Sequence, residues 1–97
     1  MNQSLIEEKL IVLSKTLLKL RSVEEIKAFL EDLLTKSEQL SIAARLQIAE
    51  MLNSGIPYSQ IQRETGASSA TVAKVSDNLK YGKDGFKVAL ERLGKSK

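Results

Sequence analysis

The sequence of 97 residues contains no cysteine, no histidine and no tryptophan. Without cysteine and histidine, disulfide bonds, thiolate nucleophiles, imidazole bases and the usual zinc sites are excluded. The carboxylates form no convergent set with a nucleophile, and helix termini or solvent-facing positions explain them. We therefore expect no enzymatic activity, no metal and no cofactor.

The sequence also lacks a long apolar segment, since nothing in it approaches the roughly 20 apolar residues that span a bilayer. Its first residues carry two adjacent glutamates, Glu7 and Glu8, and no small-residue cleavage site, which is unlike a signal peptide. We expect a cytoplasmic protein that has no membrane partner.

Aromatic residues are scarce as well, with two tyrosines and two phenylalanines, although 42% of the residues are hydrophobic. The apolar residues are mainly leucine, isoleucine, valine and alanine in helical spacing, and strand patterns are almost absent. This composition predicts an all-α fold. A chain of this length forms one domain whose core is small, so that a partner subunit would help to complete it.

Four Ser/Thr residues are each followed three positions later by Glu or Gln, which is the pattern of a capping box at the start of a helix. These pairs are Ser4/Glu7, Ser22/Glu25, Thr35/Glu38 and Ser59/Gln62. Together with breaks at glycine and proline they predict six helices, over residues 5–20, 23–34, 36–53, 60–65, 69–81 and 84–94. We interpret residues 1–97 as a single domain with dimerisation helices in 1–54, a helix-turn-helix in 58–81 and a C-terminal helix in 84–94.

The predicted first helix is apolar on more than one face. Leu10, Leu13, Leu17 and Leu20 form one stripe, and Ile11 and Leu18 lie on the far side. Exposing each of the latter forgoes about 1.5–3 kcal/mol of burial, so the pattern favours a second copy of the chain. The same acidic, leucine-rich half leaves a second hypothesis open, in which the protein is a helical dimerisation module that binds a protein partner.

The segment "TGASSATVAKVSDNLK", residues 65–80, predicts the second half of a helix-turn-helix. Gly66 can adopt the left-handed conformation of a tight turn, and Ile61 of the preceding helix can pack on Val72 and Val75. Ser68 can cap the second helix. In this arrangement the second helix enters the major groove of DNA by its N-terminal residues. The alternative is an ordinary capped surface helix whose small residues pack against a neighbour.

Charge favours the DNA hypothesis, because residues 59–97 hold eight Lys/Arg against four Asp/Glu, whereas residues 1–58 hold seven against eight. Small side chains before Lys74 permit close approach to base edges, and Arg63 and Lys80, with Lys83 and Lys87, are candidates for phosphate contacts. The predicted DNA-binding residues are Ser59, Gln60, Gln62, Arg63, Ser68, Ser69, Ala70, Thr71, Ala73, Lys74 and Lys80.

With "FLEDLLTKSEQLSIAARLQIAEML" and "ETGASSATVAKVSDNLKYG", the sequence resembles the Trp repressor superfamily, and more closely its YerC/YecD-like branch, over about residues 22–82. The resemblance implies an all-helical, intertwined homodimer that regulates transcription, most simply as a repressor. It also implies a double-stranded operator that is pseudo-palindromic, with the two recognition helices about one DNA turn apart.

The resemblance further implies an effector pocket. Thr35, Arg45 and Thr71 match residues that surround tryptophan in Trp repressor, whereas Lys74 replaces an arginine, Asn78 a serine and Val75 a glycine. Lysine cannot stack on a ring as a guanidinium does, and Val75 adds bulk. We therefore expect weak or absent tryptophan binding, and either a smaller effector or none. For Arg45 the alternative is a stem that covers apolar surface and a head paired with Glu38 or Glu50.

Overall fold

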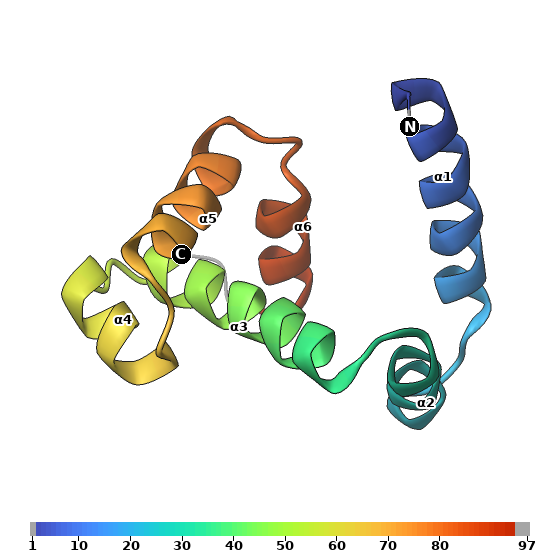
Figure 1. Cartoon of the computed structure of the whole chain (residues 1–97), viewed down its shortest axis with the longest axis horizontal. Helices are drawn as coiled ribbons and strands as arrows, with labels where there is room; N and C mark the ends of the chain where they lie inside the picture. Colours follow the sequence, from blue (N-terminus) through green and yellow to red (C-terminus); the bar gives the residue numbers. More distant parts are fainter. Residues whose placement is uncertain (1, 95–97) are drawn as a thin grey trace. The chain divides into compact units, whose positions relative to one another are not determined.

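The computed structural model describes residues 2–94, which form six α-helices and no strand (Figure 1). The predicted all-α class is confirmed, and two predicted helices, 36–53 and 69–81, have the observed bounds. The other boundaries differ by at most two residues. The helices are α1 (Gln3–Lys19), α2 (Val23–Leu33), α3 (Lys36–Asn53), α4 (Tyr58–Thr65), α5 (Ser69–Tyr81) and α6 (Gly85–Arg92).

Two of the four predicted capping boxes form. The Thr35 pair is reciprocal: the Thr35 N–H donates to Glu38 Oε1 (2.9 Å) and the Glu38 N–H donates to Thr35 Oγ1 (3.1 Å). At α2, Ser22 Oγ accepts the Glu25 N–H (3.1 Å), while the Glu25 carboxylate accepts the Arg21 N–H (2.7 Å). Both helices therefore begin where their sequence predicts.

The boxes at Ser4 and Ser59 were wrong. Helix α1 begins earlier because Asn2 is its N-cap, with Asn2 Oδ1 accepting the Leu5 N–H (2.9 Å). Helix α4 begins at Tyr58 after Pro57, which has no side-chain cap, because the fixed φ of proline suits the entry to a helix. Ser59 thus lies inside the first turn of α4.

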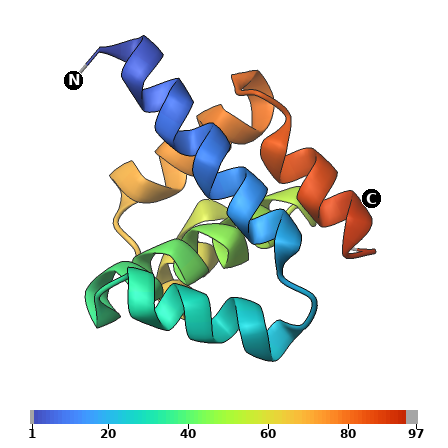
Figure 2. The same cartoon turned by 90° about the vertical axis from the view of Figure 1, so that its right-hand side faces the viewer.

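The chain divides into two compact units, residues 1–39 and 40–97, and the division falls within α3. The first unit consists of α1, α2 and the first residues of α3 (Figure 2). Neither α1 nor α2 has a buried residue. Of the predicted stripe on α1, Leu13, Leu17 and Leu20 are half-buried, but Leu10 is exposed. Leu18, which we predicted on the opposite side, is 84% exposed.

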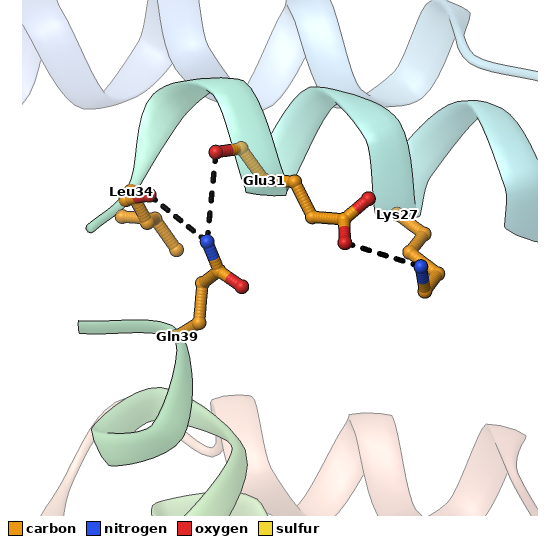
Figure 3. A network of polar contacts seen from close by, with 4 residues as sticks. All are labelled: Lys27, Glu31, Leu34 and Gln39. Carbon is orange, nitrogen blue, oxygen red and sulfur yellow. Dashed lines mark hydrogen bonds and ion pairs between the residues drawn. The ribbon is translucent and has the colours of Figure 1, made fainter. Parts of the chain in front are cut away.

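Polar contacts connect the end of α2 with Gln39 in the first turn of α3 (Figure 3). Gln39 Nε2 donates to the carbonyl oxygen of Leu34 (3.0 Å) and, at 3.5 Å, to that of Glu31, and both carbonyls belong to the end of α2. A surface ion pair joins Lys27 Nζ to Glu31 Oε2 (3.1 Å). The Gln39 amide thereby satisfies carbonyl groups that the end of a helix leaves without partners.

The second unit contains the apolar core of the described residues. Its members come from four helices, and smaller contributions from half-buried side chains such as Leu46 and Phe86 surround them. The buried apolar residues are Ile48, Ala49, Ile61, Val72, Val75 and Leu90. Helix α5 thus packs on α4 and α6, which flank it along the chain (Figure 1). Among residues 2–94 no helix is long and apolar enough to cross a membrane.

Candidate functional site

Helices α4 and α5 form the predicted helix-turn-helix, and hydrogen bonds stabilise the turn between them. Gly66 has φ 75°, and its N–H donates to the Gln62 carbonyl (2.8 Å). The Thr65 hydroxyl donates to the Ile61 carbonyl (2.7 Å) and accepts the Ala67 N–H (3.2 Å). The left-handed glycine is therefore part of a defined turn, as the sequence predicts.

Below the turn, Ile61 of α4 lies in one buried cluster with Val72 and Val75 of α5, which confirms the predicted packing. This cluster fixes α5 by its inner face. Since apolar interiors are close-packed, the orientation of the outer face of α5 is fixed with it.

The first turn of α5 exposes small side chains. We call Ser69, Ala70 and Ala73 the small-residue face, and all three are exposed. Ser68 is the N-cap, as predicted, and its Oγ accepts the Thr71 N–H (3.1 Å). The helix therefore presents its first turn without a long side chain in front of it.

The predicted DNA-binding residues are all on α4, α5 and the turn between them, but they differ in exposure. Gln60, Gln62 and Thr71 are half-buried, and Gln60 Nε2 donates to Glu64 Oε2 (3.1 Å), which engages one of its donors. The exposed members are Ser59, Arg63, Ser68, Ser69, Ala70, Ala73, Lys74 and Lys80.

Among the basic side chains near this unit, Arg63, Lys74, Lys80 and Lys83 are exposed and make no ion pair within the described part of the chain. Lys87 differs, because its Nζ lies 3.6 Å from Asp84 Oδ1. These four cations have no carboxylate partner among the described residues, whereas Lys87 would have to leave the Asp84 carboxylate to bind another anion.

A cavity of about 310 Å³ lies beside α5, between it and residues of α3 and α6. We call it the α5 cavity. Five of the six residues predicted for an effector pocket line it, namely Arg45, Thr71, Lys74, Val75 and Asn78. The other lining residues are Ala70 and Phe86.

Thr35, the sixth predicted pocket residue, is not among the lining residues. It belongs to the first unit, and its hydroxyl accepts the Glu38 N–H in the capping box. The hydroxyl therefore serves the start of α3.

Two lining residues were missed by the sequence. Ala70 belongs to the predicted DNA-binding set, and Phe86 lies in the predicted C-terminal helix 84–94, to which no site residue is assigned. The signal for Phe86 was its place just after the short turn that follows α5, which brings α6 back alongside α5.

The α5 cavity carries positive charge. Arg45 and Lys74 line it, and no carboxylate does. Arg45 is exposed and forms no ion pair with Glu50 within the described residues, and its pairing with Glu38 stays a prediction. Val75 is 2% exposed and belongs to both the cavity wall and the core.

Residues 2–94 hold no group of three His, Cys, Asp or Glu side chains that could bind a metal ion.

The chain is similar to known proteins over nearly its whole length. The model of the family described as Trp repressor protein matches residues 8–94. The uncharacterized YerC protein of Bacillus subtilis (strain 168) is 43% identical over 81 residues, which covers 84% of this chain and 78% of that protein.

Solved structures agree. A TrpR-like protein from Eubacterium eligens ATCC 27750 superposes with a TM-score of 0.88 at 36% identity, covering 99% of both chains. A candidate Trp repressor from Staphylococcus aureus gives a TM-score of 0.85 at 36% identity over 92% of this chain and 89% of that one. The family match, the identity to YerC and these folds together show that this chain belongs to the Trp repressor family.

Proposed function

We propose that this protein is a sequence-specific DNA-binding transcriptional regulator that acts as a homodimer, most simply as a repressor. The observation that carries the proposal is the first turn of α5, which is exposed and built of small residues on a helix anchored in the core. Helix-turn-helix proteins read the major groove with this part of their second helix. Such a role places the protein with the chromosome, in the cytoplasm.

The exposed side chains suggest a division of the contacts. The small-residue face permits approach to base edges and thymine methyl groups. Arg63, Lys80 and Lys83, which have no carboxylate partner within residues 2–94, suit phosphate contacts that orient the protein without reading the sequence. Lys74 is exposed on α5 and also lines the α5 cavity.

Selection from random DNA duplexes tests the proposal directly. We expect enrichment of a pseudo-palindrome whose half-sites are about one helical turn apart. If no sequence were enriched after repeated selection, specific DNA binding would be refuted.

Variants sharpen the assignment. Lys80→Ala should weaken binding to all duplexes alike and reduce the slope of log affinity against log salt by about 1, because one phosphate contact is lost. Ser69→Ala should cost roughly 1–3 kcal/mol at one base pair if the hydroxyl makes a good base contact. Lys27→Ala is a matched control, because this lysine is ion-paired with Glu31 on α2. An equal loss in the control would argue that only net charge matters.

The homodimer is supported by α1, whose apolar side chains are at most half-buried within the described residues of one chain. Ile11 is 54% and Leu18 84% exposed, and neither α1 nor α2 has a buried residue. Covering such side chains with a second copy gains about 1.5–3 kcal/mol for each. A two-fold dimer would also present two copies of α5 to a pseudo-palindromic site.

We further propose that the α5 cavity binds a small anionic effector and binds tryptophan weakly or not at all. Arg45 and Lys74 supply two cations, whereas Val75 fills part of the space and Lys74 cannot stack on an indole as arginine does. Calorimetry with tryptophan should show no saturable heat. The double variant Lys74→Arg/Val75→Ala should gain affinity for tryptophan. A stoichiometric signal from the unaltered protein would refute this interpretation of Val75.

The second candidate function is a helical module that binds a protein partner, and the exposed apolar residues of α1 favour it. Ionic strength separates the two functions. DNA affinity that depends on several phosphates falls steeply with salt, whereas an apolar protein interface changes little.

A further inference from the structure

Two adjacent serines at the start of α5 have different surroundings. Ser68 Oγ accepts the Thr71 N–H (3.1 Å) and lies 3.0 Å from Thr71 Oγ1. The Ser69 hydroxyl is exposed and has no hydrogen bond within the described residues. Both serines are in the set predicted to bind DNA, so the difference bears on which of them can read a base.

The hydroxyl of Ser68 is largely occupied. A serine hydroxyl has one donor and two acceptor sites. One acceptor site takes the Thr71 N–H, and the hydroxyl pair with Thr71 uses either the donor or the second acceptor site. A base edge would have to compete with these contacts, whereas the Ser69 hydroxyl is free.

Thr71 connects Ser68 with the α5 cavity. Its backbone N–H is one of those that the first turn of a helix leaves without a partner, and its side chain lines the α5 cavity. The contacts of Ser68 with Thr71 therefore stabilise both the first turn of α5 and the part of the cavity wall that Thr71 forms. Because the small-residue face begins at Ser69, its position depends on the same contact.

We propose that Ser68 is a positioning residue, which fixes the first turn of the recognition helix together with the Thr71 wall of the cavity and does not itself read a base pair. The proposal rests on the DNA-binding function proposed above. It assigns base reading at this end of α5 to Ser69 and its neighbours on the small-residue face.

The test compares Ser68→Ala, Ser68→Thr and Ser69→Ala in the full-length chain. Hydrogen exchange of the Thr71 amide is measured by NMR without DNA. Affinities are then measured for the selected duplex and for a panel in which each base pair is changed singly. Ser68→Thr keeps the capping hydroxyl, and Ser69→Ala removes the same group one residue further along.

Loss of the cap should speed Thr71 amide exchange in Ser68→Ala and lower its affinity for every duplex by about the same factor, roughly fivefold for a cap of about 1 kcal/mol. Ser68→Thr should restore both quantities. Ser69→Ala should leave the amide unchanged and alter preference at one base pair.

The proposal would be overturned if Ser68→Ala changed preference at a single base pair, or if the Thr71 amide exchanged at the wild-type rate in that variant. A wild-type protein that bound all duplexes alike would instead refute the sequence-specific DNA binding proposed above. In that case the exchange rates, which need no DNA, would still decide whether Ser68 holds the first turn.

Discussion

The two units of the chain are built from the same kind of helix but are stabilised in different ways. Residues 2–39 have well-formed local contacts, with side-chain caps at Asn2, Ser22 and Thr35, yet α1 and α2 contain no buried residue. Residues 40–94 contain six buried apolar side chains from four helices. Local hydrogen bonds thus define where the helices of the first unit begin, and burial stabilises the second.

This difference assigns the two units different roles. Short helices in water are marginal unless tertiary packing supports them. The second unit has that packing within one chain and carries the helix-turn-helix and the α5 cavity. The first unit exposes the apolar surface that a second copy is proposed to cover.

The largest expected effect is in the core of the second unit. Ile48→Ala should lower the free energy of unfolding by about 2–5 kcal/mol, because a fully buried side chain is removed and its cavity collapses only in part. Urea denaturation followed by circular dichroism measures it. Ile48→Val is the graded control and should cost about 0.5–1.5 kcal/mol. A loss below 1 kcal/mol for the alanine variant would contradict the assignment of this core.

The next effect concerns the first unit. Leu18→Glu should weaken dimerisation by about 1.5–3 kcal/mol or more, since it removes an apolar contact and buries a charge in the proposed interface. Sedimentation velocity over a range of concentrations measures the dimer constant. Lys15→Glu, an exposed change on the same helix, is the control. A wild-type chain that is a stable monomer at micromolar concentration would contradict the dimer outright.

The local sequence was a good guide where short-range chemistry decides the structure. Gly66, Ser68 and the Thr35/Glu38 box were predicted because each forms contacts within a few residues along the chain. The capping-box pattern gave a wrong helix start at Ser59, because the helix begins directly after Pro57. A capping box is thus indicative only when no stronger start lies just before it.

Predicting the site was harder, because its residues come from distant parts of the sequence. Arg45 was placed through the family resemblance, and the structure brings it beside Lys74 and Asn78. Phe86 was missed because its contribution depends on how α6 folds back on α5. Thr35 lies in the first unit, where its hydroxyl takes part in the capping box that the local sequence predicts, and its place in the effector pocket stays a prediction.

Replacing either of two glycines of the second unit by alanine should have a smaller effect on stability. The two replacements separate the cost of close packing from the cost of backbone strain. A Cβ at Gly82 would overlap the Asn78 carbonyl oxygen, whereas one at Gly66 would meet nothing within 4 Å. Gly82→Ala should therefore cost about 1–3 kcal/mol through overpacking, and Gly66→Ala about 1–2 kcal/mol through its positive φ alone. Thermal unfolding of the two variants measures this. Equal stability of Gly82→Ala and wild type would contradict the close contact.

The smallest effect concerns the first unit, whose local contacts should make its stability sensitive to pH. The Thr35 backbone N–H, and after it the Thr35 hydroxyl, lower the pKa of Glu38 below its ordinary value of 4.5. Because the folded-state pKa is the lower one, the stabilisation is present above about pH 4.5 and is lost as the pH falls through the folded-state pKa.

Glu38→Gln, which can still act as a neutral capping-box residue, should therefore differ from wild type at pH 7 and converge with it towards pH 3. Urea unfolding at a series of pH values measures the convergence. Glu8→Gln is the control, because the Glu8 side chain has no hydrogen bond within residues 2–94. A separation between wild type and Glu38→Gln that stays constant from pH 7 to pH 3 would show that the charge of Glu38 contributes nothing to the cap. The start of α3 would then be fixed by hydrogen-bond geometry without a contribution from charge. The turn at Gly66 in the second unit is fixed in the same way, by hydrogen bonds between uncharged groups.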